Sequence, residues 1–352
     1  MNGKRNLGVD LLRIFSMYLV VVLHVLGQGG ILTGLTPYSP SYYTAWLVEV
    51  AAYCAVDCFG LISGYVSYRR EYNLRKLLPV WAQAAVYSVG ITVLFRLFVP
   101  GTVGLRDLLL AFFPAASQKY WYFTAYFGLF FFLPFLNLLV NSLDEKLARR
   151  LAITLIAVFS LLPAAFRSDL FFTRGGYTFL WLAVLYLLGA CLGRYGGEKG
   201  PSPLACLGGY ALCLLLTWGS KLALETATIR LFGEPRWADT LVSYTSPTVL
   251  FSAVFLLLFF RQLPLRSSLL RRGIGFFSPL AFGVYLIHTH PLVWNHLLAG
   301  RFAAYTSLPL GLCIVAALLT AAIIFLACAL IDLLRMRIFH VVLRRKKQSV
   351  RA

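Results

Sequence analysis

Apolar runs of about 20 residues recur along the whole chain, and they constrain its fold more than any other feature. Each run is long enough to cross a lipid bilayer as a helix. Hydrophobic residues make up 60% of the 352 residues and charged residues only 13%, against ~25% charged in soluble domains. We therefore predict an all-α, polytopic membrane protein with about ten transmembrane helices, at residues 9–29, 45–66, 77–98, 120–140, 151–166, 176–193, 204–223, 243–260, 279–298 and 308–334.

Lysine and arginine concentrate in alternate loops between these runs and in the C-terminal tail. By the positive-inside rule, this bias predicts that both termini are cytoplasmic, in a plasma-membrane protein. We expect one transmembrane domain over residues 1–340 and a basic cytoplasmic tail over 341–352, where residues 344–347 contact anionic membrane lipids. The net charge of +19 follows from the same bias and indicates no nucleic-acid partner.

The first run, 9–29, carries a polar stripe made of Asp10, Arg13 and His24. At about 100° per residue, the step from Arg13 to His24 returns to within roughly 20° of its starting direction. Both side chains therefore share one helix face, about 16 Å apart along the axis. Because ionisable residues inside a membrane helix are costly and by default mark a functional site, the stripe predicts a polar cavity beside this helix.

Asp57 in the second run lies roughly 18 Å up its helix, at a depth similar to that of His24 in the first. A carboxylate paired with His24 would fix its tautomer and stabilise its protonated form, as a general base requires. A buried pair that only holds two helices together explains the same residues equally well. Gly60, Ser63 and Gly64 are explained by close helix packing, which small residues permit.

The ninth run contains Tyr285 and His288, three residues apart and so on one helix face. His288 falls near the middle of the membrane, where a histidine is either functional or a hydrogen-bonded structural residue. His290 precedes a proline and is interpreted as structural.

The seven cysteines form no disulfide framework, since they are odd in number and lie in apolar segments. Cys54 and Cys58 stand four residues apart, but no second Cys/His cluster completes a four-ligand metal set. We therefore predict no metal site.

Four stretches together resemble the acyltransferase 3 family. Asp10-x-x-Arg13 followed by His24 is similar to the signature of that family. The segment 56–65, the late segment 278–288 with Tyr285-Leu-x-His288, and Tyr120-Trp121-Tyr122-Phe123 with Pro134 match in the same order. The chain differs from the family pattern after Arg75-Lys76, where a second arginine is missing, and after Trp121-Tyr122, where an acidic residue is missing. The resemblance implies a ten-span enzyme that acylates cell-surface glycans or other small acceptors.

The resemblance also implies roles for the polar residues. Acyl-coenzyme A, expected to be acetyl-CoA, would be a co-substrate rather than a bound cofactor. The donor-binding residues would be Arg13, Asp10, Arg75 and Lys76, where the cations suit its phosphates. His24, oriented by Asp57, would be the general base or a transient acyl carrier, with His288 as a further catalytic residue. Tyr285 and Ser63 would lie on the acceptor or oxyanion side. The acceptor would be a hydroxyl of a surface polysaccharide or of its lipid-linked precursor.

Two other classes of function remain open. His24, Asp57 and Arg13 could form the path of a transporter or flippase for a glycan or small polar solute. Inverted repeats would support that reading, but the sequence shows no convincing internal duplication. A structural membrane protein without catalysis would not need a polar set at mid-membrane depth.

Overall fold

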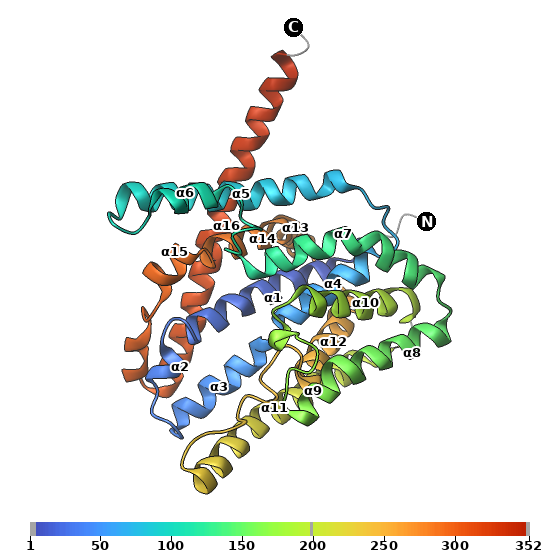
Figure 1. The fold of residues 1–352 in the computed structure, drawn as a ribbon, viewed down its shortest axis with the longest axis vertical. Helices are drawn as coiled ribbons and strands as arrows, with labels where there is room; N and C mark the ends of the chain where they lie inside the picture. Colours follow the sequence, from blue (N-terminus) through green and yellow to red (C-terminus); the bar gives the residue numbers. More distant parts are fainter. Residues whose placement is uncertain (1–4, 198–199, 350–352) are drawn as a thin grey trace.

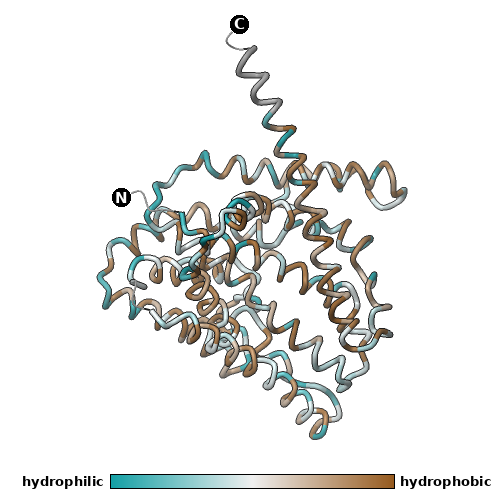
Figure 2. The backbone as a smooth tube through the Cα atoms, turned by 180° about the vertical axis from the view of Figure 1, so that it is seen from behind, coloured by the Kyte–Doolittle hydropathy of each residue, from teal (hydrophilic) through white to brown (hydrophobic). Residues whose placement is uncertain are grey.

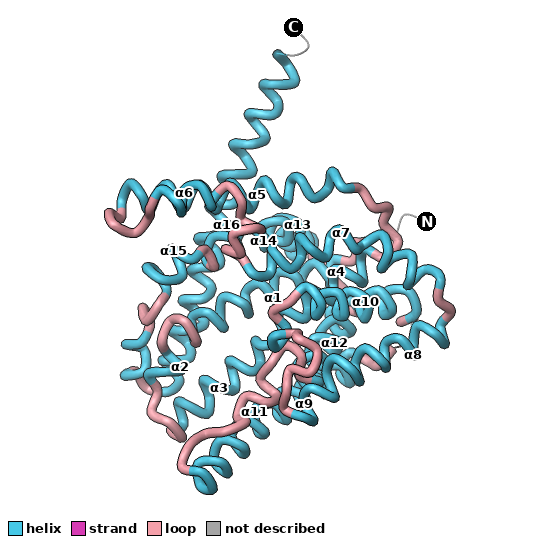
Figure 3. The backbone as a smooth tube through the Cα atoms, in the orientation of Figure 1, coloured by secondary structure: helices cyan, strands magenta, loops and turns pink. Residues whose placement is uncertain are grey.

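The apolar runs form helices throughout the computed structural model, which describes residues 5–197 and 200–349, and no strand occurs within these ranges (Figures 1 and 3). The helices are α1 (Leu7–Leu26), α2 (Ile31–Gly34), α3 (Pro40–Tyr53), α4 (Ala55–Ser67), α5 (Leu77–Phe98), α6 (Leu105–Ala111), α7 (Trp121–Ser142), α8 (Glu145–Ile156), α9 (Leu162–Phe166), α10 (Phe179–Tyr195), α11 (Pro203–Phe232), α12 (Pro247–Arg261), α13 (Ser268–Phe277), α14 (Ala281–His288), α15 (Pro291–Val293) and α16 (Leu310–Ser349). Short 3-10 or π turns are η1 (Leu74–Lys76), η2 (Ala157–Leu161), η3 (Arg174–Gly176), η4 (Ser278–Leu280), η5 (Trp294–Leu298) and η6 (Ala303–Ser307).

All ten predicted spans fall on apolar helices, but the helices differ in length. Seven are long and apolar enough to cross a membrane, and an eighth span forms if the bent pair Ser268–His288 and Pro291–Ser307 is taken as one. Phe179–Tyr195 and Pro247–Arg261 are shorter apolar helices. Hydrophobic residues run along most helices in Figure 2. The all-helical membrane class is confirmed, whereas the count of ten and the sidedness of the termini stay predictions.

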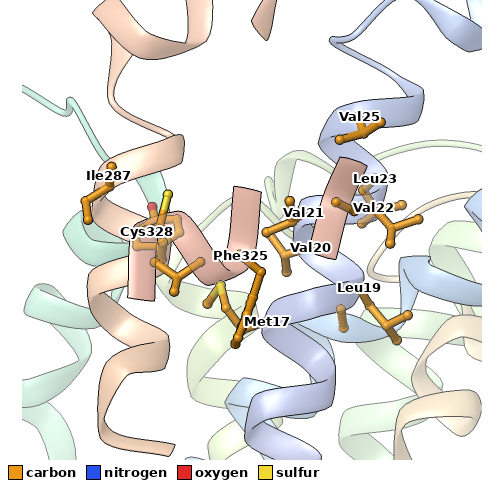
Figure 4. Packing of buried hydrophobic residues seen from close by; sticks show 14 of the residues in the cluster. Met17, Leu19, Val20, Val21, Val22, Leu23, Val25, Ile287, Phe325 and Cys328 are labelled. Carbon is orange, nitrogen blue, oxygen red and sulfur yellow. The ribbon is translucent and has the colours of Figure 1, made fainter. Parts of the chain in front are cut away.

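Helix α1 is the central helix of the bundle. It packs against α3, α4, α12, α13, α14 and α16, and most of its side chains are buried. In Figure 4, Met17 and Val20 of α1 lie beside Phe325 of α16. The helix begins after Asn6, whose side-chain oxygen accepts from the backbone N–H groups of Gly8 and Val9. Its surroundings place the polar stripe of α1 inside the protein.

Helices α4 and α10 pack closely through glycines on both sides. A Cβ at Gly64 would lie 1.9 Å from the carbonyl oxygen of Tyr186, and one at Gly189 would lie 2.0 Å from that of Leu61. Gly60 likewise faces Leu185. The predicted role of Gly60 and Gly64 in close helix packing is confirmed.

Two predicted straight spans are broken. The second run divides at Cys54 into α3 and α4, and the ninth bends by 61° between α14 and α15. At the second break, Pro291 cannot donate a backbone hydrogen bond, and His290 Nδ1 accepts from the N–H of Leu292. His290 therefore has a capping role, as its interpretation as structural requires.

Helix α16 continues beyond the bundle, so the sequence assigned to the basic tail begins as a continuation of a transmembrane helix (Figure 1). The predicted lipid contacts of residues 344–347, and residues 350–352, lie outside what the structure describes.

Candidate functional site

Arg13 and His24 line one cavity of about 420 Å³, which we call the Arg13 cavity. Arg70 and Gln83 also line it, so it is polar as well as aromatic. The cavity that the polar stripe of α1 predicts is therefore present. Its lining contains two arginines and no carboxylate, which makes it suited to an anionic ligand.

Asp10 holds Arg13 from outside this cavity. The Arg13 Nη1 donates to Asp10 Oδ1 over 2.6 Å, and Arg5 pairs with the other carboxylate oxygen. Ser278 of η4 also donates to Asp10, over 3.3 Å. Asp10 is thus placed to orient Arg13 rather than to contact a ligand itself.

A second cavity, of about 410 Å³, lies on the other side of His24 and is named the Glu49 cavity. His24, Trp121 and Tyr244 line both cavities. Glu49 is 8% exposed, and its Oε2 has no hydrogen-bond partner within the described part of the chain. A buried carboxylate without a donor is costly, so a ligand hydroxyl at this position would be stabilising.

His24 is hydrogen-bonded to His288, with 2.9 Å between His24 Nδ1 and His288 Nε2. His288 Nδ1 lies 2.6 Å from the carbonyl oxygen of Val284, which can only accept, so His288 carries its proton on Nδ1. With both rings neutral, His288 Nε2 then accepts from the Nδ1–H of His24. The lone pair of His24 is left on Nε2, which has no hydrogen-bond partner among the residues described here.

Asp57 lies elsewhere than the sequence analysis expects. Its Oδ1 accepts from the indole N–H of Trp181 over 3.0 Å, and it is fully buried between α4 and α10. The expected pairing with His24 is replaced by the His24–His288 pair, because matched depth along two helices does not fix which faces meet. Asp57 lines neither cavity and holds α4 against α10.

Tyr285 and Ser63 both line the Arg13 cavity but differ in what they can donate. The Tyr285 oxygen accepts from the backbone N–H of Tyr122 over 3.1 Å, which leaves its own O–H available. The Ser63 hydroxyl donates to the carbonyl of Phe59 over 2.8 Å, so its proton is already used. Tyr285 is therefore the better donor to a developing oxyanion.

Arg75 and Lys76 lie in η1, where both are exposed, and neither lines the two cavities. Their predicted part in donor binding stays a prediction. Arg70, which lies between α4 and η1, is the basic residue of this region that lines the Arg13 cavity.

The sequence analysis missed Glu49, Arg70 and Trp294, whose ring packs edge-on at 4.5 Å from the His24 ring. Glu49 could have been identified from the sequence, because it is an ionisable residue inside an apolar run. Arg70 was hidden among the loop arginines that set membrane orientation. An aromatic such as Trp294 carries no comparable signal.

The sequence model of the acyltransferase 3 family, described as an acyltransferase domain, matches residues 6–331. The chain belongs to the acyltransferase 3 family. No curated protein and no solved structure matched the chain. The match extends over all helices that line the two cavities, so this family member carries its candidate site within the matched domain.

Proposed function

We propose that this acyltransferase moves an acetyl group from acetyl-coenzyme A in the Arg13 cavity to a hydroxyl of a surface polysaccharide, or of its lipid-linked precursor, in the Glu49 cavity. The observation that carries the proposal is that His24 lines both cavities. A plasma-membrane location with both termini cytoplasmic would open the Arg13 cavity toward the compartment that holds acyl-coenzyme A.

The charges of the Arg13 cavity support donor binding. A guanidinium binds phosphate through two parallel hydrogen bonds and stays charged at any working pH. Arg13 is preorganised by Asp10, and Arg70 provides a second cation. The nucleotide part of the donor would extend past Arg70 toward Arg75 and Lys76 on the exposed η1, while the pantetheine arm runs along α1 toward His24.

The tautomer of His24 supports general-base catalysis. In the proposed step, Nε2 of His24 removes the proton of the acceptor hydroxyl as that oxygen attacks the thioester carbonyl carbon. The resulting oxyanion is stabilised by the O–H of Tyr285. When the tetrahedral intermediate collapses, the carbon–sulfur bond breaks and the leaving thiolate takes the proton from His24, giving the acyl ester and free coenzyme A.

A two-step route uses the same lone pair. His24 Nε2 attacks the thioester carbon and the carbon–sulfur bond breaks, which gives an acyl-histidine and coenzyme A thiolate. The acceptor hydroxyl oxygen on the Glu49 side then attacks the acyl carbon and the carbon–nitrogen bond breaks. The hydroxyl proton passes to the thiolate, so the products are the ester, coenzyme A and neutral His24. In both routes His288 is a positioning residue, because it fixes the His24 tautomer without lining a cavity. In neither route does Asp57 contact the reacting atoms, so its catalytic role would be indirect.

The test is transfer of radiolabelled acetyl from acetyl-coenzyme A in membranes that contain the native acceptor. We expect His24→Ala to lower the rate by about 10²–10⁴-fold, which is the typical contribution of a general base. His296→Ala is the matched control, since His296 is exposed in η5 and lines neither cavity. Equal rates for His24→Ala and wild type, at equal membrane levels, would overturn the proposal.

The alternative of a transporter or flippase is favoured by the same observation, because two cavities that meet at one histidine could also conduct a solute. It predicts no coenzyme A-dependent product. Wild-type protein in liposomes that moves a labelled saccharide across the bilayer without acetylating it would make transport the better reading.

A further inference from the structure

A third cavity, of about 560 Å³, lies away from His24 and is named the Trp237 cavity. Its volume falls within the ~300–1,000 Å³ that is typical of small-molecule sites. Four parts of the chain line it: α3, the segment 163–175, α11 and the segment 235–246. The proposed mechanism does not use it.

The floor of the Trp237 cavity is an internally paired cluster. Lys221 is 2% exposed, donates to Glu225 and to the hydroxyl oxygen of Tyr42, and lies 4.0 Å from the ring centroid of Trp46. The Tyr42 O–H in turn donates to Glu225 over 2.7 Å. Because each charge here has a partner, the buried lysine is not a free cation that would attract an anionic ligand.

The rim of the cavity carries aromatic and acidic side chains. Trp237 is 46% exposed, and the Arg167 guanidinium lies 4.6 Å from its ring centroid. Arg167 is the left-handed C-cap of α9, at φ 52°, and Trp237 also has a positive φ, of 58°. Asp239 is exposed at the same rim, and its carboxylate has no hydrogen-bond partner among the described residues.

The charges of the lining are nearly balanced, with a slight negative excess. Three carboxylates, of Asp169, Glu225 and Asp239, face two cations, of Arg167 and Lys221. Burial alone would raise the pKa of Asp169, but hydrogen bonds from Thr173 and from the N–H of Arg174 lower it overall, so it is charged at neutral pH. Phosphates and uronates are therefore disfavoured, and the hydroxyls and carboxylates of the lining disfavour an apolar ligand.

The Trp237 cavity adjoins the Glu49 cavity. Trp46 lines the first and Glu49 the second, and on α3 they are separated by about 4.5 Å of helix rise on one face. Ser243 and Thr245 line the Trp237 cavity, whereas Tyr244 between them lines the Glu49 cavity. Ser243 also donates to the carbonyl of Gly175 over 3.2 Å, which ties two of the four lining segments together.

We infer that the Trp237 cavity is a binding subsite for a neutral saccharide unit of the acceptor, next to the unit whose hydroxyl enters the Glu49 cavity. The inference rests on the proposed saccharide acceptor. A sugar ring presents C–H faces that pack on an indole and hydroxyls that both donate to carboxylates and accept from hydroxyl side chains. Trp46, Trp237 and Asp239 supply those partners, while the paired Lys221–Glu225 floor offers no free charge.

The test is binding to an array of neutral, uronate-bearing and phosphorylated oligosaccharides by detergent-free protein in lipid nanodiscs. Protein with His24→Ala is used, so that a bound glycan is not modified. We expect neutral oligosaccharides to bind, Trp237→Ala to weaken binding about tenfold or more, and Asp239→Asn to weaken it by less. The matched controls are Phe172→Ala, within the segment 163–175, and Glu234→Gln, next to the segment 235–246. Both residues are exposed and do not line the cavity, so the variants should change binding less than twofold.

Three results would overturn the inference: no neutral oligosaccharide bound, tighter binding of the anionic glycans, or a Trp237→Ala variant that binds like Phe172→Ala. Thermal unfolding of each variant shows whether a loss of binding comes from misfolding, and Asp239→Asn is the second, milder variant. Neutral-glycan binding without acetyl transfer by wild type would contradict the proposed function alone. Transfer without Trp237-dependent binding would contradict the subsite alone.

Discussion

The Arg13 cavity and the Glu49 cavity are similar in size but differ in the ionisable residues that line them. The first has two arginines and no carboxylate, and the second has one carboxylate and no arginine or lysine. Trp121, Tyr244 and His24 form part of the wall of both. A neutral histidine at the boundary between a chamber lined by two arginines and a chamber lined by one buried carboxyl group can face a phosphorylated donor on one side and a hydroxylated acceptor on the other.

The difference between the two linings shows that the sequence motifs do not correspond one to one to the two cavities. Residues that the sequence places in three motifs, Arg13, Ser63 and Tyr285, line the same Arg13 cavity. Glu49, in none of those motifs, marks the second chamber. Changes in one chamber should therefore affect one substrate, and only the shared boundary should affect both.

The largest effect is expected at the shared boundary. His288→Phe keeps a ring of similar shape but removes the acceptor for the Nδ1–H of His24, so the His24 tautomer is no longer fixed. We expect kcat to fall by about 10²–10⁴-fold with little change in the KM of either substrate. Steady-state kinetics at varied donor and acceptor concentrations measure this, and a rise in KM with unchanged kcat would show that His288 serves only binding.

Arg13→Ala should weaken donor binding and leave acceptor binding unchanged. Loss of a hydrogen bond to a charged group costs about 1.5–3 kcal/mol, so the KM for acetyl-coenzyme A should rise roughly 10–150-fold. Arg13→Lys keeps the charge but loses the bidentate geometry, so its KM for acetyl-coenzyme A should lie between those of wild type and Arg13→Ala. An increase in acceptor KM of the same size would show that the two chambers are not separate in function.

Glu49→Gln should weaken acceptor binding and leave donor binding unchanged. It keeps the size of the side chain but replaces the carboxyl group that would hydrogen-bond a substrate hydroxyl, so we expect acceptor KM to rise about tenfold. Donor affinity, measured by acetyl-coenzyme A binding to the purified protein, should stay within twofold. Weaker donor binding in this variant would place the donor in the Glu49 cavity.

The smallest effects are expected at the exposed arginines between α4 and α5. Arg70 lines the Arg13 cavity but is exposed, so Arg70→Ala should raise donor KM only about two- to fivefold, as exposed ion pairs contribute about 0–1 kcal/mol. Arg75→Ala should change it less, because Arg75 lies outside the lining. A larger effect at Arg75 than at Arg70 would show that the nucleotide contacts are made mainly on η1.

The helices and the polar face of α1 could be predicted from the sequence, because hydropathy and the helical repeat are local properties. The family could also be predicted, from motifs that keep their order along the chain. The partner of Asp57 could not, because matched depth along the helices suggested His24 of α1, whereas Asp57 accepts from Trp181 of α10. The break at Pro291 was signalled by the proline, but its 61° bend was not.

By itself, the sequence determined that this chain is a helical membrane protein with Asp10, Arg13 and His24 on one face of its first helix. Only the tertiary structure decided that His24 pairs with His288, 264 residues away, and that two chambers with different polar linings meet there. The physical reason is that hydropathy puts each segment in the membrane but does not choose its neighbours. That choice depends on close contacts such as those of Gly64 and Gly189, which the fold as a whole must satisfy at once.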